Sequence, residues 1–92
     1  SFDTAYTAAK LLASDGNYKK ALEVYAIDEK KASADQKDVD FYGEYASVAW
    51  RAGDKALTNA LIDKRIALVK ADTTLSEGEK TQQISEYESE RP

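Results

Sequence analysis

The sequence predicts an all-α fold built from five helices, and three observations carry this prediction. Apolar residues recur every three or four positions along most of the chain, as they do on one face of a helix. Two glycines are each followed by Asn or Asp, at Gly16-Asn17 and Gly53-Asp54, a pattern typical of one helix ending and the next beginning. With one proline and four glycines in 92 residues, little interrupts helices elsewhere.

The first two predicted helices form a hairpin over residues 1–34, with one helix at about 3–14 and the next at about 18–32. Gly16 is expected in the left-handed conformation that ends a helix, and Asn17 is expected to cap the following helix through its side-chain oxygen. The apolar faces of the pair are formed by Phe2, Tyr6, Ala9 and Ala13 and by Ala21, Leu22 and Tyr25.

A second hairpin is predicted over residues 35–71. Ser33 followed by Gln36 is interpreted as a capping box for the third helix, and Gly53-Asp54 separates that helix from the fourth. The fourth helix is apolar over most of its circumference, which indicates burial on more than one side. Its apolar residues are Leu57, Ala60, Leu61, Ile62, Ile66, Leu68 and Val69.

A polar closing helix is predicted over residues 75–90. Ser76 and Glu79 have the spacing of a capping box, and Ile84 and Tyr87 are the only sizeable apolar residues that follow. We therefore expect this helix to cover the end of the second hairpin. Its last turn is acidic and is expected to fray, with Glu86, Glu88 and Glu90.

The core is expected to combine small residues with aromatic rings. Alanines let neighbouring helices approach to about 8–10 Å, and large side chains then fill the remaining space. The small residues are Ala9, Ala21 and Ala46, and the rings that fill the gaps are Tyr18, Tyr25, Tyr42 and Tyr45.

Composition excludes several function classes. The chain has no cysteine and no histidine, so it offers no disulfide, no Cys/His zinc site and no histidine for acid-base catalysis. Asp35, Asp38 and Asp40 lie in a polar turn without the glycine pattern of a calcium loop, and we interpret them as solvated. We therefore expect no enzyme activity, no cofactor and no metal.

A net charge of -4 and a pI near 4.8 argue against nucleic acid or an anionic membrane surface as partner. The apolar runs are far shorter than the roughly 18 residues that span a bilayer, so we expect a soluble protein without membrane insertion. The lack of cysteine fits an exported, periplasmic bacterial protein as well as a cytoplasmic one. The chain begins at Ser1 and contains no methionine, so we expect a processed protein or part of a longer one.

The two predicted hairpins form an internal repeat, because Gly16 and Gly53 lie 37 positions apart in equivalent surroundings. The segment GNYKKALEVY, from Gly16 to Tyr25, resembles the turn and second helix of a tetratricopeptide repeat (TPR). In the second unit Lys55 and Thr58 depart from that pattern. The residues of the second unit that fit it are Tyr42, Tyr45, Ala46, Gly53 and Asp54.

The TPR resemblance implies a right-handed stack of antiparallel helical hairpins forming a superhelix. It also implies a non-enzymatic protein-protein interaction or scaffold module, which binds a peptide or a partner helix on the concave face made by the first helix of each repeat. The candidate partner-binding residues on that face are Tyr6, Lys10, Gly43, Ser47, Trp50 and Arg51.

Two of these candidates have alternative interpretations. Trp50 has open space beside it on the helix, since Gly43 and Ser47 precede it on the same face, and it would either contact a ligand or pack under the closing helix against Ile84 or Tyr87. Lys10 and Arg51 would either bind a peptide carboxylate or remain solvated.

Two other function classes stay open. One is the helical part of an exported bacterial ligand- or glycan-binding protein, with Tyr6, Tyr42 and Trp50 as stacking platforms. The other is a dimerising structural spacer. Two repeats are fewer than the roughly three that usually stand alone, so the closing helix, a flanking domain or a second copy must cover the apolar end. The exposed association surface of the spacer would be Leu61, Ile62, Leu68 and Val69.

Overall fold

The structure, a computed structural model, describes all 92 residues and contains five α-helices and no strand. The all-α class and the five helices are therefore confirmed. The helices are α1 (Phe2–Ser14), α2 (Tyr18–Lys31), α3 (Val39–Arg51), α4 (Lys55–Ala71) and α5 (Glu77–Ser89).

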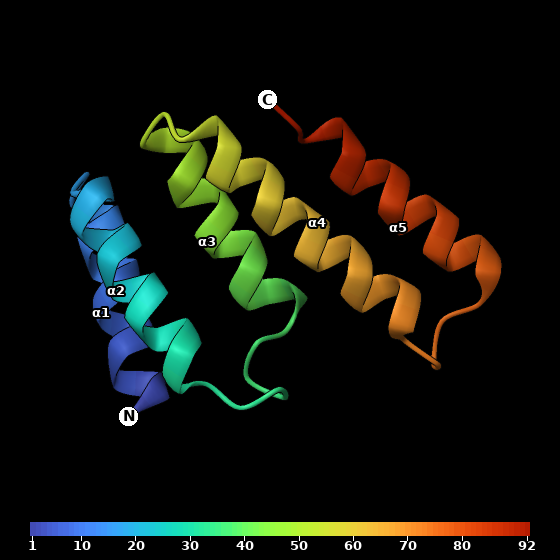
Figure 1. Ribbon diagram of the computed structural model, residues 1–92, viewed down its shortest axis with the longest axis horizontal. Coiled ribbons are helices and arrows are strands. Elements are labelled where there is room, and N and C mark those ends of the chain that lie inside the picture. Colours follow the sequence, from blue (N-terminus) through green and yellow to red (C-terminus); the bar gives the residue numbers. More distant parts are fainter.

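The helices follow one another along the longest dimension of the molecule, with the pair α1 and α2 at one end and α5 at the other (Figure 1). The α1 helix packs on α2 and α3 packs on α4, so each forms a hairpin, while α2 contacts α3 and α4 contacts α5. The molecule measures 38 × 29 × 18 Å. No helix combines the length and the apolar character needed to cross a lipid bilayer.

The glycines that separate the helices of each hairpin adopt the predicted conformation. Gly16 has φ +79° and Gly53 has φ +81°, values that a side chain would strain. Asp54 then caps α4, because its Oδ1 accepts a hydrogen bond from the backbone N–H of Leu57 at 3.0 Å. The expected cap by Asn17 is wrong, since Asn17 precedes α2 without a capping hydrogen bond from its side chain.

The predicted capping box at Ser33 and Gln36 does not open the third helix. The Gln36 side chain accepts a hydrogen bond from the Ser33 backbone at 2.9 Å, but these residues form a turn of their own. Asp38 lies directly before α3 and caps it by accepting from the backbone of Phe41 at 2.9 Å. A carboxylate at this position accepts a hydrogen bond from a free backbone N–H, and its negative charge interacts favourably with the positive end of the helix dipole. Asp38 therefore sets the start of α3.

The capping box predicted at the start of the closing helix is confirmed. The Glu79 backbone N–H donates to Ser76 Oγ at 3.1 Å, and the Ser76 backbone N–H donates to Glu79 Oε1 at 2.9 Å. The helix α5 therefore begins where the sequence predicts.

An aromatic cluster joins the two hairpins. The rings of Tyr25 and Tyr45 stack with centroids 5.0 Å apart and planes 11° apart, and Phe41 packs edge-on against Tyr25 at 5.8 Å. Tyr42 is also buried, whereas Tyr18 is only partly buried, so three of the four predicted filler tyrosines are confirmed. The small residues predicted beside them, Ala9, Ala21 and Ala46, are buried in the same core.

The α4 helix is buried on two sides, as its apolar circumference predicts. Leu61 belongs to the core shared with α3, while Ile62 and Ile66 join Tyr87 of α5 in a second cluster. The predicted dimerisation surface is therefore wrong, because α3 and α5 cover it: Leu61, Ile62 and Val69 are each at most 3% exposed and Leu68 is partly buried.

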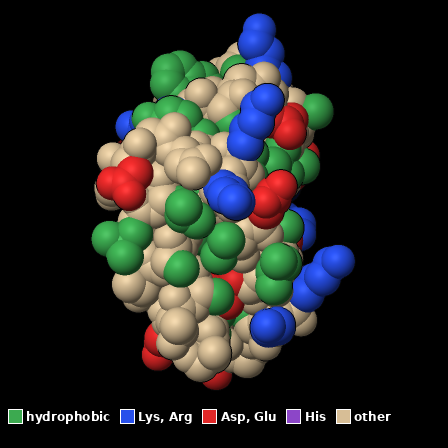
Figure 2. Space-filling model, turned by 90° about the vertical axis from the view of Figure 1, so that its left-hand side faces the viewer, with side chains coloured by type: hydrophobic (Ala, Val, Ile, Leu, Met, Phe, Trp, Pro, Cys, Tyr) green, Lys and Arg blue, Asp and Glu red, His purple; other side chains and the backbone are tan.

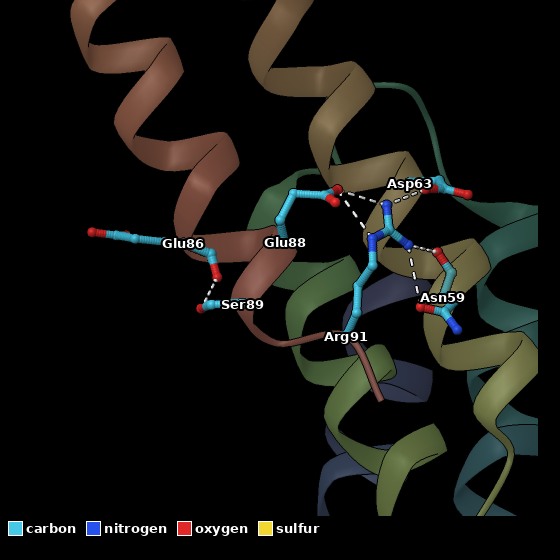
Figure 3. A network of polar contacts seen from close by, with 6 residues as sticks. All are labelled: Asn59, Asp63, Glu86, Glu88, Ser89 and Arg91. Atoms are coloured by element: carbon cyan, nitrogen blue, oxygen red, sulfur yellow. Dashed lines mark hydrogen bonds and ion pairs between the residues drawn. The ribbon is translucent and has the colours of Figure 1, made fainter.

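Polar contacts tie the end of α5 to α4 (Figure 3). The guanidinium of Arg91 donates to Asn59 Oδ1 at 3.2 Å and pairs with Asp63 at 2.5 Å, and it also pairs with Glu88 at 2.8 Å. Of the acidic residues expected to fray, Glu88 pairs with Arg91 and Glu90 pairs with Arg65, whereas Glu86 forms no ion pair.

A second polar contact set joins α2, α3 and α4. Glu29 accepts hydrogen bonds from the Tyr42 hydroxyl at 2.8 Å and from the Lys64 ammonium at 2.5 Å. Burial alone would raise the pKa of Glu29, but these two donors hold it below its ordinary value. The Glu29 carboxylate of α2 therefore connects α3 and α4 to its own helix.

One buried carboxyl has no such partner. Asp28, in the last part of α2, is 0% exposed, and neither of its oxygens accepts a hydrogen bond. Burial raises its pKa, an effect that the N-terminal ammonium and Lys31 partly offset. The charged form of Asp28 is therefore disfavoured in the fold.

Replacing Tyr25 by Ala should lower the free energy of unfolding by about 3 kcal/mol, because the stacked ring is lost from the centre of the core. Urea denaturation followed by circular dichroism measures this. Tyr25→Phe keeps the ring and serves as the control, with a much smaller loss. Equal melting curves for Tyr25→Ala and the parent chain would contradict this packing.

Replacing Asp28 by Asn should stabilise the protein more at pH 7 than at pH 4. The folded-state pKa lies above the unfolded one, so the stability that Asp28 contributes is present below the unfolded pKa and is lost as the pH rises through the folded pKa. We expect a gain at pH 7 that shrinks towards pH 4, because Asn cannot ionise and so avoids the cost of a buried charge. Denaturant melts of both chains at the two pH values measure it, and parallel pH profiles would contradict it.

Candidate functional site

Three adjoining hollows run along α1 and α3 and continue to α4. They share walls, since Gly43 and Arg65 line the first and second, and Glu44 lines the second and third. We call their combined surface the groove. The first hollow encloses about 250 Å³ and is lined by Gly43, Ala46, Ser47, Trp50, Thr58, Ile62, Arg65 and Glu90.

Five of the six predicted binding residues line the groove. Tyr6 lies in the second hollow and Lys10 in the third, while Ser47 borders all three. Gly43 and Trp50 line the first hollow. Arg51 lines none of the three, because its guanidinium turns back along α3 and donates to the Ser47 hydroxyl.

Trp50 forms an open wall of the first hollow. Its side chain is 58% exposed, and the small residues Gly43 and Ser47 leave space beside the indole on the same face of α3. The alternative prediction, that Trp50 packs under the closing helix, is wrong. Tyr87 and Ile84 instead pack against the apolar face of α4.

Tyr6 and Lys10 are already engaged with the protein. The Tyr6 hydroxyl donates to Glu44, and the Lys10 ammonium lies 4.3 Å from the centroid of the Tyr6 ring. Burial, together with the nearby Glu44 carboxylate, raises the pKa of Tyr6 well above its ordinary value. These contacts fix the α1 wall of the groove against α3.

Arg65 is a groove residue that the sequence did not reveal. Its guanidinium lies against Gly43, where a Cβ atom would come within 2.8 Å of it, and its Nε–H donates to the Val39 carbonyl at 2.9 Å. The same group lies 4.1 Å from the centroid of the Tyr87 ring and 3.3 Å from the Glu90 carboxylate. Gly43 was singled out for the space beside Trp50, but its main effect is to admit this cation.

The groove carries carboxylates as well as an aromatic wall. Asp40 and Glu44 line the second hollow, and Glu90 lines the first. Arg65 is mostly buried and faces Glu90, so the exposed charged side chains that line the first two hollows are acidic, whereas Lys10 lines the third. No group of three or more acidic side chains has the geometry to hold a metal ion.

Comparison of the chain with protein-family models, with curated proteins and with solved structures found no match. The resemblance to tetratricopeptide repeats therefore stays a prediction.

Replacing Arg65 by Ala should cost about 1–2 kcal/mol of unfolding free energy, because a carbonyl hydrogen bond, a cation-π contact and an ion pair are lost together. Arg51→Ala is the matched control, with a change within about 0.5 kcal/mol because Arg51 is exposed and contacts one hydroxyl. Urea denaturation measures both. Equal effects of the two substitutions would show that Arg65 does not connect α3 to α5.

Proposed function

We propose that this chain is a non-enzymatic protein-interaction module, which holds a peptide or a helix of a partner in the groove along α1 and α3. The exposure of Trp50 is the observation that carries the proposal. Its indole is 58% exposed and lines a cavity that also has polar walls, an arrangement typical of ligand sites. Tryptophan is also among the residues that most often dominate binding energy at interfaces.

The rigidity of the groove supports the proposal. Most of its residues lie on α1, α3 and α4, and the Tyr6–Glu44 and Arg65–Val39 hydrogen bonds hold these helices in register. A site carried by packed helices needs little ordering when a ligand arrives, so more of the contact energy is available for binding. The groove also follows the first helix of each hairpin, the surface that a TPR-like arrangement would use.

The chemistry of the walls indicates the kind of ligand. Trp50, Ala46 and Ile62 make part of the first hollow apolar. Asp40 and Glu44 lie a short distance along the same helix. We therefore propose a peptide with one apolar anchor side chain against Trp50 and a basic residue reaching the carboxylates.

A glycan ligand is the weaker alternative. Stacking of sugars would use the rings of Tyr6, Tyr42 and Trp50, but Tyr42 is only 6% exposed and the Tyr6 ring is covered on one side by Lys10. A single open ring offers one platform. That is less than a sugar chain needs for a specific site.

Selection of peptides from a random library displayed on phage, with the full chain as bait, tests the proposal. Enriched peptides should share an apolar residue near a basic one. Labelled copies of them should bind at least about thirtyfold more weakly to Trp50→Ala, the loss expected for a hot spot of about 2 kcal/mol. Fluorescence anisotropy measures these affinities.

The matched control is Leu11→Ala, which removes another exposed apolar side chain that lies outside the groove. It should leave the affinity unchanged. Peptides that bind Trp50→Ala as tightly as the parent chain, or a selection without any enriched sequence, would contradict the proposal.

A further inference from the structure

The outer face of the first hairpin carries exposed apolar side chains that no helix covers. Leu11 of α1 is 62% exposed and Ile27 of α2 is 53% exposed, and Trp50 is the only other large hydrophobic residue as open as these. The α1–α2 hairpin forms one end of the molecule (Figure 1), and Figure 2 is viewed from that end. Hydrophobic side chains lie along its middle, with lysine or arginine side chains beside them and some Asp or Glu side chains among them (Figure 2).

Exposed lysines outnumber exposed carboxylates on the α1–α2 hairpin, with Lys10, Lys19, Lys20, Lys30 and Lys31 against Asp3, Asp15 and Glu23. The helix α2 carries exposed lysines at both ends, and none of them forms an ion pair. Of the acidic residues on α2, Asp28 is buried and Glu29 is paired with Lys64, which leaves Glu23. The unpaired lysines are Lys19, Lys20, Lys30 and Lys31.

The opposite end of the molecule is acidic. The helix α5 lies farthest from the first hairpin along the longest axis (Figure 1). Its one basic residue is Lys80, whose ammonium donates to the Lys70 carbonyl of α4. Its acidic residues are Glu77, Glu79, Glu86 and Glu88, and all four are exposed.

We propose that the outer face of the α1–α2 hairpin docks on the α5 end of a second copy of this chain. The unpaired lysines of α2 would meet the carboxylates of α5, and Leu11 and Ile27 would be removed from water. Two basic ends repel each other, so the contact joins unlike ends. A contact of this kind leaves one free basic end and one free acidic end, and it therefore produces open chains of copies rather than a closed dimer.

This association is independent of the groove. Leu11 and Ile27 lie on the outer face of the hairpin, and neither of them lines the groove. The net charge of -4 acts against self-association in general, whereas the opposite charge of the two ends favours one orientation. Added salt should therefore weaken the contact.

Sedimentation velocity of the full chain tests the proposal, at concentrations from about 10 µM to about 1 mM. The weight-average sedimentation coefficient should rise with concentration and fall when salt is added. Lys19→Glu with Lys20→Glu gives one variant, and Glu77→Lys with Glu86→Lys gives the other. None of these four side chains has a partner that its loss would break, and circular dichroism checks the folding of both variants.

Each variant alone should associate at least about tenfold more weakly than the parent chain, because its two ends carry the same sign. An equimolar mixture of the two should recover association, since each now presents an end that fits the other. Trp50→Ala should associate as the parent does, and Leu11→Asp should not associate. A parent chain that is monomeric throughout, a variant that associates unchanged, or a mixture that fails to associate would overturn the proposal.

Discussion

The stack of Tyr25 on Tyr45 is the contact on which the arrangement of this molecule depends, because it joins the first hairpin to the second. Phe41 packs against both rings, and Tyr6 and Phe2 of α1 reach Phe41 at 5.5 and 5.6 Å. Alanines buried around these rings let the helices come close enough for the rings to meet. The groove adjoins this cluster, since Tyr25 lines its third hollow and Tyr6 its second.

Arg65 links the groove to the closing helix. Its guanidinium contacts the backbone of α3, the Tyr87 ring of α5 and the Glu90 carboxylate, so three elements meet at one side chain. Arg91 adds a second attachment, between the end of α5 and α4. The closing helix, which has few apolar residues of its own, therefore depends on two arginines as well as on Tyr87 and Ile84.

The sequence alone predicted the helices, their order and the two-sided burial of α4, because these follow from apolar spacing and from glycines such as Gly16 and Gly53. It failed where the deciding contact joins distant residues. The roles of Arg65 and Arg91 depend on which side chains α3, α4 and α5 bring together, and no local sequence pattern predicts these long-range contacts. The cap at Asp38 was missed because Ser33 and Gln36 offered a similar signal a few residues earlier. Five of the six candidate site residues line the groove since helical phase places them on one face, whereas Arg51 bends back to Ser47.

The fluorescence of Trp50, the only tryptophan in the chain, tests most directly whether the groove is open. The emission maximum of the free protein should lie close to that of N-acetyltryptophanamide in water, and acrylamide should quench the emission efficiently. A blue-shifted maximum with weak quenching would show that the indole is covered. In that case the groove would not be the surface that this structure presents to a partner.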